Sequence, residues 1–134
     1  MKILHEVNDF PVPMFVYGTL RRGHGLNWCL RDSEFIKKTR TKSEFNMFGA
    51  GCPIIVRNGE TAITGELYLV CEEDFRTVDN IEVGAGYNRE WVELEDGEEA
   101  IAYTYALDGC GNLIISGDWT QQNTPEELSM EMGA

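Results

Sequence analysis

Glu82 is the acidic side chain that the sequence pattern places best for proton transfer. If residues 72–82 are helical, Phe75, Val78 and Glu82 fall at i, i+3 and i+7 and share one face. Phe75 and Val78 should face the core, so the carboxylate should point inward, where loss of water raises its pKa toward neutrality. A carboxylate of this kind suits general acid–base catalysis. By itself, however, the residue favours a simpler interpretation, in which the helix ends at Asn80 and Glu82 is one surface acid among 23 acidic residues.

The stretch FVYGTLRRG, residues 15–23, is a candidate binding loop. Its apolar run stops at Gly18, and glycine lets the main chain approach a ligand closely. Backbone N–H groups without a strand partner can hold a carboxylate or amide oxygen. We therefore take Tyr17, Gly18, Thr19 and Leu20 as candidate substrate-binding residues, although these residues alone favour the plain exit of a strand.

Two further candidates follow Glu82 closely in the chain. Tyr87 is suited to form a pocket wall and to donate a hydrogen bond. Arg89 is suited to hold a substrate carboxylate or to pair with a protein acid, and the structural pair is the more common role of an arginine.

The elements that must position these residues are mostly β-strands. The patterns predict strands within 14–17, 44–60, 61–70, 87–95 and 99–107, and short helices within 25–35 and 71–82. In 61–70, Ile63, Gly65 and Leu67 should lie on one face, with Glu66 and Tyr68 on the other. The sequence therefore predicts an α+β fold with a small mixed, mostly antiparallel β-barrel and flanking short helices. The polar, acidic residues 116–134 are expected to be partly disordered.

Length and charge limit the classes of function. The 134 residues predict one domain, 1–134, with a core at about 14–119 and an acidic C-terminal tail at about 120–134. The net charge of −12 argues against binding to nucleic-acid backbones or anionic membranes. No apolar stretch is long enough to span a membrane, and the N-terminus does not resemble a signal peptide.

Cysteine usage and known motifs exclude several chemistries. The four cysteines include no C-x-x-C pair, and with two histidines they predict no zinc site and no disulfide framework. We therefore expect a cytoplasmic protein with core cysteines. Cys29 and His24 are five residues apart, a spacing that places them on diverging faces of a helix. Nucleotide-binding, zinc-protease and serine-hydrolase motifs are absent.

Three motifs in register resemble the gamma-glutamylcyclotransferase-like family, which includes AIG2-like small bacterial members. They are FVYGTLRRG, GELYLV and DNIEVGAGYNREWV, and the resemblance covers residues 14–119. It implies a compact β-barrel with a pocket at its mouth and a reaction that needs no metal or organic cofactor. The implied reaction releases 5-oxoproline and an amine or amino acid from a small-molecule gamma-glutamyl amide.

The resemblance also implies roles for individual residues. Glu82 maps onto the family's catalytic glutamate, and Tyr17, Gly18, Thr19 and Leu20 map onto its substrate loop, with Arg21 and Arg22 at the edge of the pocket or outside it. The third loop position, Thr19, is a threonine, as in gamma-glutamylamine cyclotransferase-like members of the family. The alternative is a non-catalytic binding module of the same fold that acts through its acidic surface on a protein partner.

Overall fold

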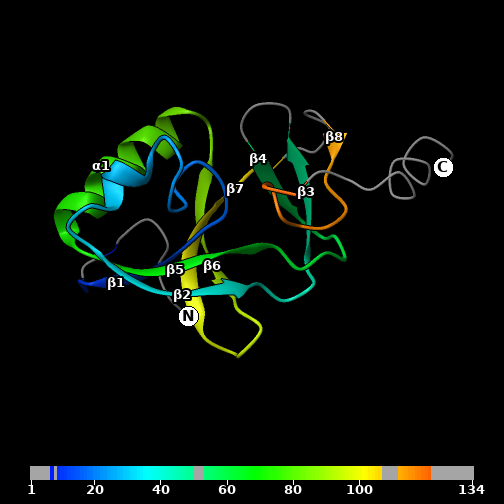
Figure 1. Ribbon diagram of the computed structural model, residues 1–134, viewed down its shortest axis with the longest axis horizontal. Helices are drawn as coiled ribbons and strands as arrows, with labels where there is room; N and C mark the ends of the chain where they lie inside the picture. Colours follow the sequence, from blue (N-terminus) through cyan, green and yellow to red (C-terminus); the bar gives the residue numbers. More distant parts are fainter. Residues whose placement is uncertain (1–6, 8, 50–52, 107–111, 122–134) are drawn as a thin grey trace, which may run out of the picture.

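The computed structural model describes residues 7, 9–49, 53–106 and 112–121 of the chain (Figure 1). Within these residues, five strands form one sheet in the order β2-β5-β1-β7-β6, and three strands form a second sheet in the order β4-β3-β8. The elements are β1 (Val12–Val16), a 3-10 helix (Asn27–Leu30), β2 (Glu34–Arg40), β3 (Phe45–Gly49), β4 (Pro53–Arg57), β5 (Thr64–Val70), α1 (Glu72–Gly84), β6 (Asn88–Glu93), β7 (Glu99–Thr104) and β8 (Asn112–Leu113).

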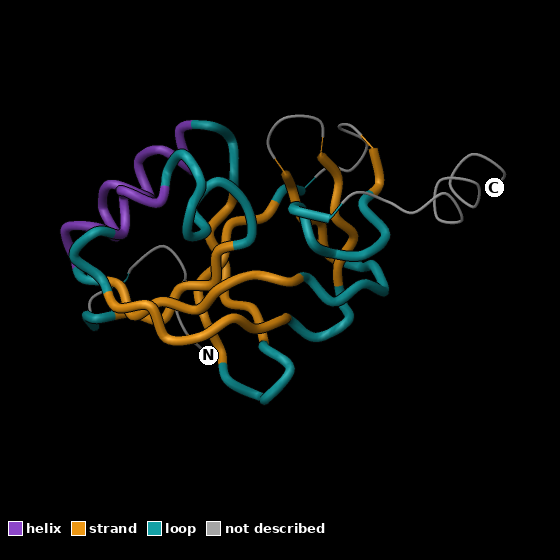
Figure 2. Tube along the Cα trace, viewed as in Figure 1, coloured by secondary structure: helices purple, strands orange, loops and turns teal. Residues whose placement is uncertain are grey.

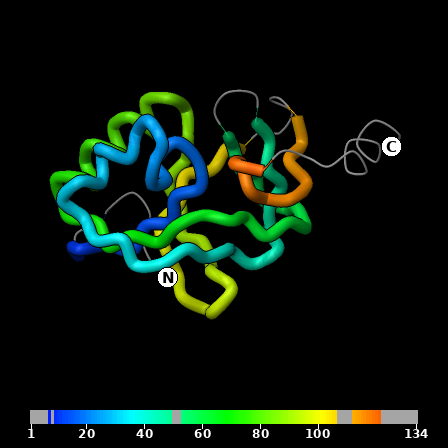
Figure 3. The backbone as a smooth tube through the Cα atoms, viewed as in Figure 1, coloured from blue at the N-terminus to red at the C-terminus, as the bar shows by residue number. Residues whose placement is uncertain are grey.

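The five-stranded sheet is the middle layer of the fold. Its central strand β1 runs antiparallel to β5 and parallel to β7, and Figure 3 shows these segments side by side although they are far apart in the chain. Met14 and Val16 of β1 join a buried cluster with Phe75 of α1, whereas Phe15 joins a second cluster with β3 and β4. The helix therefore covers one face of the large sheet and the small sheet covers the other (Figure 2).

Both faces of β5 are buried as a result. The predicted alternation is present, because Ile63 and Leu67 join the cluster on the side of the small sheet and Tyr68 joins the cluster on the side of α1. The polar face of this strand, however, is not solvated. Glu66 is 8% exposed and Tyr68 is 3% exposed, because the loop after β1 lies over them and makes hydrogen bonds to both.

The sequence left open whether this helix ends at Asn80 or continues to Glu82, and helix α1 is the longer of the two. It begins with three acids, Glu72–Asp74, which suit the positive end of the helix dipole. It continues past Asn80 to Gly84, and Gly86 follows with a φ of +97°, a conformation that glycine adopts readily. Glu82 therefore lies in the last turn. None of the helices in the described part of the chain is long and apolar enough to cross a membrane.

Three predicted features differ from the structure. The helix expected within 25–35 is only the 3-10 helix Asn27–Leu30, and the residues after it form β2, which the sequence did not predict. β2 is an edge strand in which alternate residues are exposed, so its pattern is mostly polar. Of the segment expected to be partly disordered, residues 116–119 are packed against the fold and Asp118 is buried, Thr120 and Gln121 are exposed, and 122–134 lie outside the described residues.

The predicted barrel is not confirmed. Within the described residues, the two edge strands of the large sheet approach each other only at one end, where Thr41 and Leu94 form an isolated bridge and the N–H of Lys42 donates to the Glu93 carbonyl. The large sheet and the small sheet are joined to each other by separate contacts, such as the bridge between Val56 and Tyr105.

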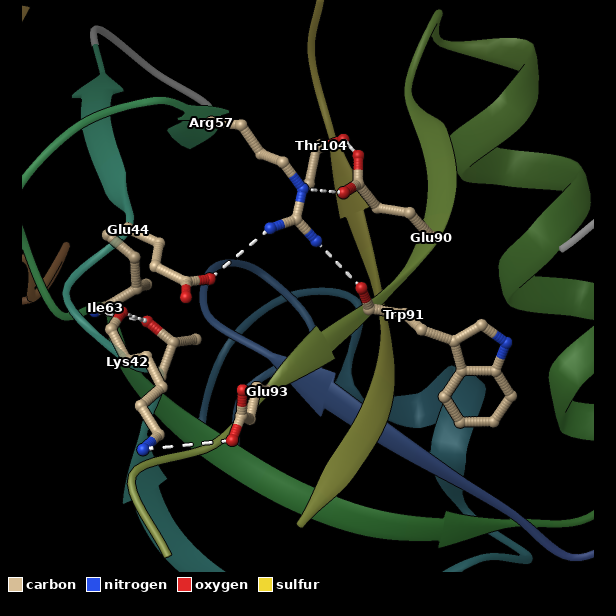
Figure 4. A network of polar contacts seen from close by, with 9 residues as sticks. Lys42, Glu44, Arg57, Ile63, Glu90, Trp91, Glu93 and Thr104 are labelled. Atoms are coloured by element: carbon tan, nitrogen blue, oxygen red, sulfur yellow. Dashed lines mark hydrogen bonds and ion pairs between the residues drawn. The ribbon is translucent and has the colours of Figure 1, made fainter. Parts of the chain in front are cut away.

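Arg57 provides a polar link between the sheets. It lies on β4 and donates to the Trp91 carbonyl oxygen of β6 at 2.8 Å (Figure 4). It also pairs with the Glu90 carboxylate, which in turn accepts a hydrogen bond from Thr104 of β7. Since β4 carries part of the cavity described below, this network fixes the cavity wall against the large sheet.

Candidate active site

A cavity of about 420 Å³ lies where the end of α1, the loop after β1, the end of β7 and the start of β4 meet. The large sheet lies between α1 and the small sheet, so segments from its two sides can meet only where the sheet ends. All four segments reach the same end of β1, and the cavity lies there. The lining residues are Phe15, Val16, Tyr17, Gly18, Thr19, Leu20, Leu26, Pro53, Ile54, Ile81, Glu82, Ala85, Tyr87, Tyr103 and Tyr105.

Glu82 reaches this cavity from the last turn of α1. Phe75 and Val78 on the same face are buried, and this orientation carries the Glu82 side chain inward. Its backbone carbonyl accepts the N–H of Tyr87 at 3.0 Å, which fixes the chain as it leaves the helix. Burial raises the pKa of the Glu82 carboxyl to about 7. At neutral pH such a group both accepts and returns a proton.

All four predicted residues of the loop 17–20 line the same cavity. They follow β1, whose pairing with β5 ends at Val16 opposite Glu66. A tight turn comes next, in which the N–H of Arg21 donates to the Gly18 carbonyl at 3.0 Å. Glycine is required at position 18 for a reason that the sequence did not indicate: a Cβ there would lie 2.5 Å from Cγ of Pro53 on β4.

The tyrosine hydroxyls at the cavity hold protein segments together. Tyr17 donates to the Tyr103 carbonyl at 2.6 Å, Tyr87 to the Pro53 carbonyl at 2.7 Å and Tyr105 to the Ala85 carbonyl at 2.6 Å. Burial raises the pKa of Tyr17, so its hydroxyl stays protonated as a donor. The rings of Tyr87 and Tyr105 also pack edge to face, with centroids 4.6 Å apart. These residues therefore give the cavity a rigid, largely aromatic wall.

Arg89 does not line the cavity with the other predicted residues. It donates to Oδ1 of Asp79 at 2.8 Å, and the same oxygen accepts a hydrogen bond from the Tyr103 hydroxyl at 2.9 Å. This is the structural pairing that the sequence left open as the alternative to substrate binding. Arg21 and Arg22 also lie outside the cavity lining, as expected, but Arg21 is only 6% exposed rather than at a solvated edge.

Sequence reasoning missed nine of the fifteen described residues that line the cavity. Two of them are Tyr103, near the end of β7, and Tyr105, just after it, and two tyrosines at i and i+2 were a usable signal for one strand face. Pro53, Ile54 and Leu26 had no such signal, because only tertiary packing brings them to the loop.

The described cavity wall carries an unusual charge balance. Glu82 is the one carboxylate among the lining residues, and none of them is lysine, arginine or histidine. The chain as a whole has a net charge of −12. A negatively charged ligand group in this cavity would therefore have to be held by backbone N–H groups, such as those of the loop 17–20, and not by a cationic side chain of the lining.

Comparison with known proteins agrees with the geometry. The family model described as "Gamma-glutamyl cyclotransferase, AIG2-like" matches residues 14–121. A Vibrio cholerae protein and a Methanocaldococcus jannaschii protein, both named "putative gamma-glutamylcyclotransferase", are 33% and 35% identical to this chain. The matches cover 81% and 79% of this chain and 96% and 93% of the relatives. The crystal structure of an uncharacterised Pyrococcus horikoshii protein superposes with a TM-score of 0.72 at 29% identity, covering 91% of this chain and 96% of the other.

Proposed function

Because this chain belongs to the gamma-glutamyl cyclotransferase, AIG2-like family, we propose that it is an amide-cleaving cyclotransferase that acts without a cofactor on a small gamma-glutamyl amide. The observation that carries the proposal is the meeting of a half-buried carboxylate, whose pKa is about 7, with a glycine-containing loop in one cavity. We assign Glu82 as the general acid–base and residues 17–20 as the loop that holds the substrate.

The reaction requires one proton carrier. Glu82 removes a proton from the α-ammonium group of the substrate, and the free amine attacks the side-chain carbonyl carbon of the same glutamyl unit. The new C–N bond closes a five-membered ring and leaves an oxyanion, which backbone N–H groups of Thr19 and Leu20 are suited to stabilise. When the oxyanion collapses, the original C–N bond breaks and Glu82 returns the first proton to the departing nitrogen. Glu82 then takes the remaining extra proton from the ring nitrogen and passes it to the freed amine, which leaves as an ammonium ion. The products are 5-oxoproline and an amine.

The cavity wall also supports a choice of leaving group. Every gamma-glutamyl substrate carries the α-carboxylate of its glutamyl unit, which a backbone N–H group of the loop 17–20 is suited to hold. An amino acid that leaves through its α-nitrogen adds a second carboxylate, next to the reacting bond. Within the described residues, the lining offers this carboxylate no cationic side chain and places Glu82 nearby. An amine without an adjacent carboxylate meets only aromatic and aliphatic groups and Glu82. We therefore assign a gamma-glutamylamine, rather than a gamma-glutamyl-α-amino acid, as the preferred substrate.

The direct test measures 5-oxoproline from a panel of gamma-glutamyl amides, with alkylamine, aromatic amine and α-amino acid leaving groups. We expect the amines to be cleaved with the higher kcat/KM. In Glu82→Gln, kcat should fall by about 10²- to 10⁴-fold, the usual loss when a general acid–base is removed. Glu73→Gln is the matched control, since Glu73 is an exposed acid in the first turn of the same helix.

The outcomes separate the proposal from its alternative. Retained turnover in Glu82→Gln would remove Glu82 from the mechanism. If the folded protein released no 5-oxoproline from any amide, the enzymatic proposal would fail, and a binding module acting through the acidic surface would take its place.

A further inference from the structure

The loop 17–20 is followed by an arginine that the proposed reaction does not use. Arg21 is 6% exposed, and its Nη1 donates to Oδ1 of Asp118 at 2.8 Å, with 97 positions of chain between the two residues. Asp118 is 4% exposed. Both charges are therefore removed from water, which costs free energy that a buried ion pair often does not fully recover.

Asp118 is also held by hydrogen bonds within its own segment. Its Oδ1 also accepts the backbone N–H of Thr120 at 2.9 Å and the Thr120 hydroxyl at 2.6 Å. Burial alone would raise the pKa of Asp118, but the hydrogen bonds from Thr120 and Arg21 outweigh it and hold the pKa below its usual value. The carboxylate therefore stays charged and oriented at neutral pH.

The segment around Asp118 is in turn attached to β5. The N–H of Thr64 donates to the Gly117 carbonyl at 2.8 Å. Gly117 has a φ of +74°, and a Cβ at this position would lie 2.1 Å from the Ala62 carbonyl oxygen. The close approach admits only glycine, so the segment has little freedom to shift.

The loop is thus held from two sides. On one side the N–H of Arg22 donates to Glu66 of β5 at 2.8 Å, and on the other the Arg21 side chain binds Asp118. The rings of His24 and Trp119, with centroids 5.4 Å apart, add a second contact between the same two segments. Neither Arg21 nor Asp118 lines the cavity, so any effect on a bound substrate must pass through the loop.

We propose that the Arg21–Asp118 ion pair positions the loop 17–20 for binding the glutamyl part of the substrate, which makes Arg21 a positioning residue and residues 116–120 a part of the active-site support. The inference rests on the proposed function for its kinetic consequence. Its structural consequence, an ordered loop, does not depend on that function.

The experiment compares Arg21→Met, Asp118→Asn and the double variant with the wild-type chain. Hydrogen–deuterium exchange is followed in a peptide that covers residues 17–26 and in one that covers β5, and kcat and KM are measured on the same samples. Arg40→Met is the matched control, because Arg40 makes a similar contact, 3.0 Å to Glu95, at the exposed surface. Asp118→Asn keeps the shape of the side chain, so a folded variant is available if Arg21→Met does not fold.

We expect loop amides to exchange faster in both single variants while β5 is unchanged. KM should rise by about 10- to 100-fold with a smaller change in kcat, since misplacement of a positioning group by about 1 Å can cost about 10²-fold. The double variant should lose no more than either single variant, because the two side chains act as one unit. Arg21→Lys should recover part of the loss, as it retains the charge but not the planar fork.

Two results would overturn the inference. One is loop exchange equal to the wild type in both single variants. The other is faster loop exchange with kcat/KM within about twofold of the wild type, which would make the pair purely structural. If the wild-type chain cleaves no gamma-glutamyl amide, the proposed function fails separately, and loop exchange alone then decides whether the pair positions the loop.

Discussion

At the scale of residues, the proposed proton transfer depends on the removal of water from around Glu82. An exposed glutamate would be a weak base and a poor acid at neutral pH, whereas burial brings the pKa of Glu82 to about 7. Its neighbours in the cavity are tyrosine rings whose hydroxyls are bound to backbone carbonyls. The surroundings therefore keep the pKa of Glu82 near neutrality, and the described lining supplies no cationic side chain that would lower this pKa.

The raised pKa of Glu82 predicts a pH-dependent cost to stability. The folded chain holds this proton up to about pH 7, while the unfolded chain releases it near pH 4.5. The folded state thus binds more protons between these values, and its stability should fall as pH rises through this window and then level off. Glu82→Gln cannot ionise. Its free energy of unfolding should equal that of the wild type at pH 4 and exceed it by about 1–3 kcal/mol at pH 8.

Urea unfolding of both proteins at pH 4, 6 and 8 measures this difference. Glu73→Gln should show no such dependence, because Glu73 is exposed. A constant difference between the wild type and Glu82→Gln at all three pH values would mean that the carboxylate is solvated in the folded protein.

At the scale of elements, one contact in the cavity wall joins segments that belong to different sheets. The loop after β1 lies against the start of β4, where Gly18 and Pro53 are in direct contact. Tyr87, which follows α1, donates its hydroxyl to the same Pro53. Pro53 therefore joins the loop and the chain after α1, and small changes at this contact should alter the distance between the loop and Glu82.

Gly18→Ala tests this contact. A Cβ would lie 2.5 Å from Cγ of Pro53, so the loop or β4 must shift. We expect kcat/KM to fall by at least about tenfold and stability to decrease by about 1–3 kcal/mol, the usual cost of overpacking. Steady-state kinetics and urea unfolding provide the two measurements.

Gly25→Ala is the control in the same loop. A Cβ at this position has no atom within 4 Å, and its φ is not positive. This variant should retain full activity and gain slightly in stability through the unfolded state. Equal losses of kcat/KM in both variants would mean that neither glycine of the loop can be replaced, whether or not an atom lies nearby. The specific role of the contact with Pro53 would then be excluded.

At the scale of the molecule, the shape of the cavity depends on how the small sheet is held against the large sheet, because both sheets contribute to its lining. Figure 4 shows Arg57 of β4 between Glu44, Glu90 and the Trp91 carbonyl. Its guanidinium also lies 5.1 Å from the centroid of the Phe45 ring. The cavity lies across the junction of the two sheets, so this network should influence both stability and activity.

Arg57→Met should therefore lower the free energy of unfolding by about 1–3 kcal/mol, since it removes charge-assisted hydrogen bonds between the sheets. It should also raise KM, because β4 carries Pro53 and Ile54 of the cavity wall. Arg76→Met, which removes an exposed pair with Glu72 within one helix, should cost less than about 0.5 kcal/mol. If the two variants lost equal stability, the network would not be what joins the sheets.

The parts of the protein that the sequence predicted are those set by local patterns. The helical spacing of Phe75, Val78 and Glu82 and the alternation in β5 each depend on residues close in the chain. The hairpin of β6 and β7 follows in the same way from two strand patterns, one largely polar and one largely apolar, around a turn. For this reason local patterns predicted α1 and three central strands, whereas Glu82 and the loop 17–20 were assigned to a site only through the resemblance of three motifs to a known family.

Only the tertiary structure decided which of these residues meet and what surrounds them. β2 is a strand because β5 offers it a partner, although its own pattern is polar. Arg89 turns to Asp79 and Arg21 to Asp118, and these choices depend on which acid packing brings within reach. Pro53 reaches Gly18 from another sheet. The local sequence supplied a candidate acid–base and a candidate loop, whereas long-range packing determined the cavity that removes water and shifts the pKa of Glu82.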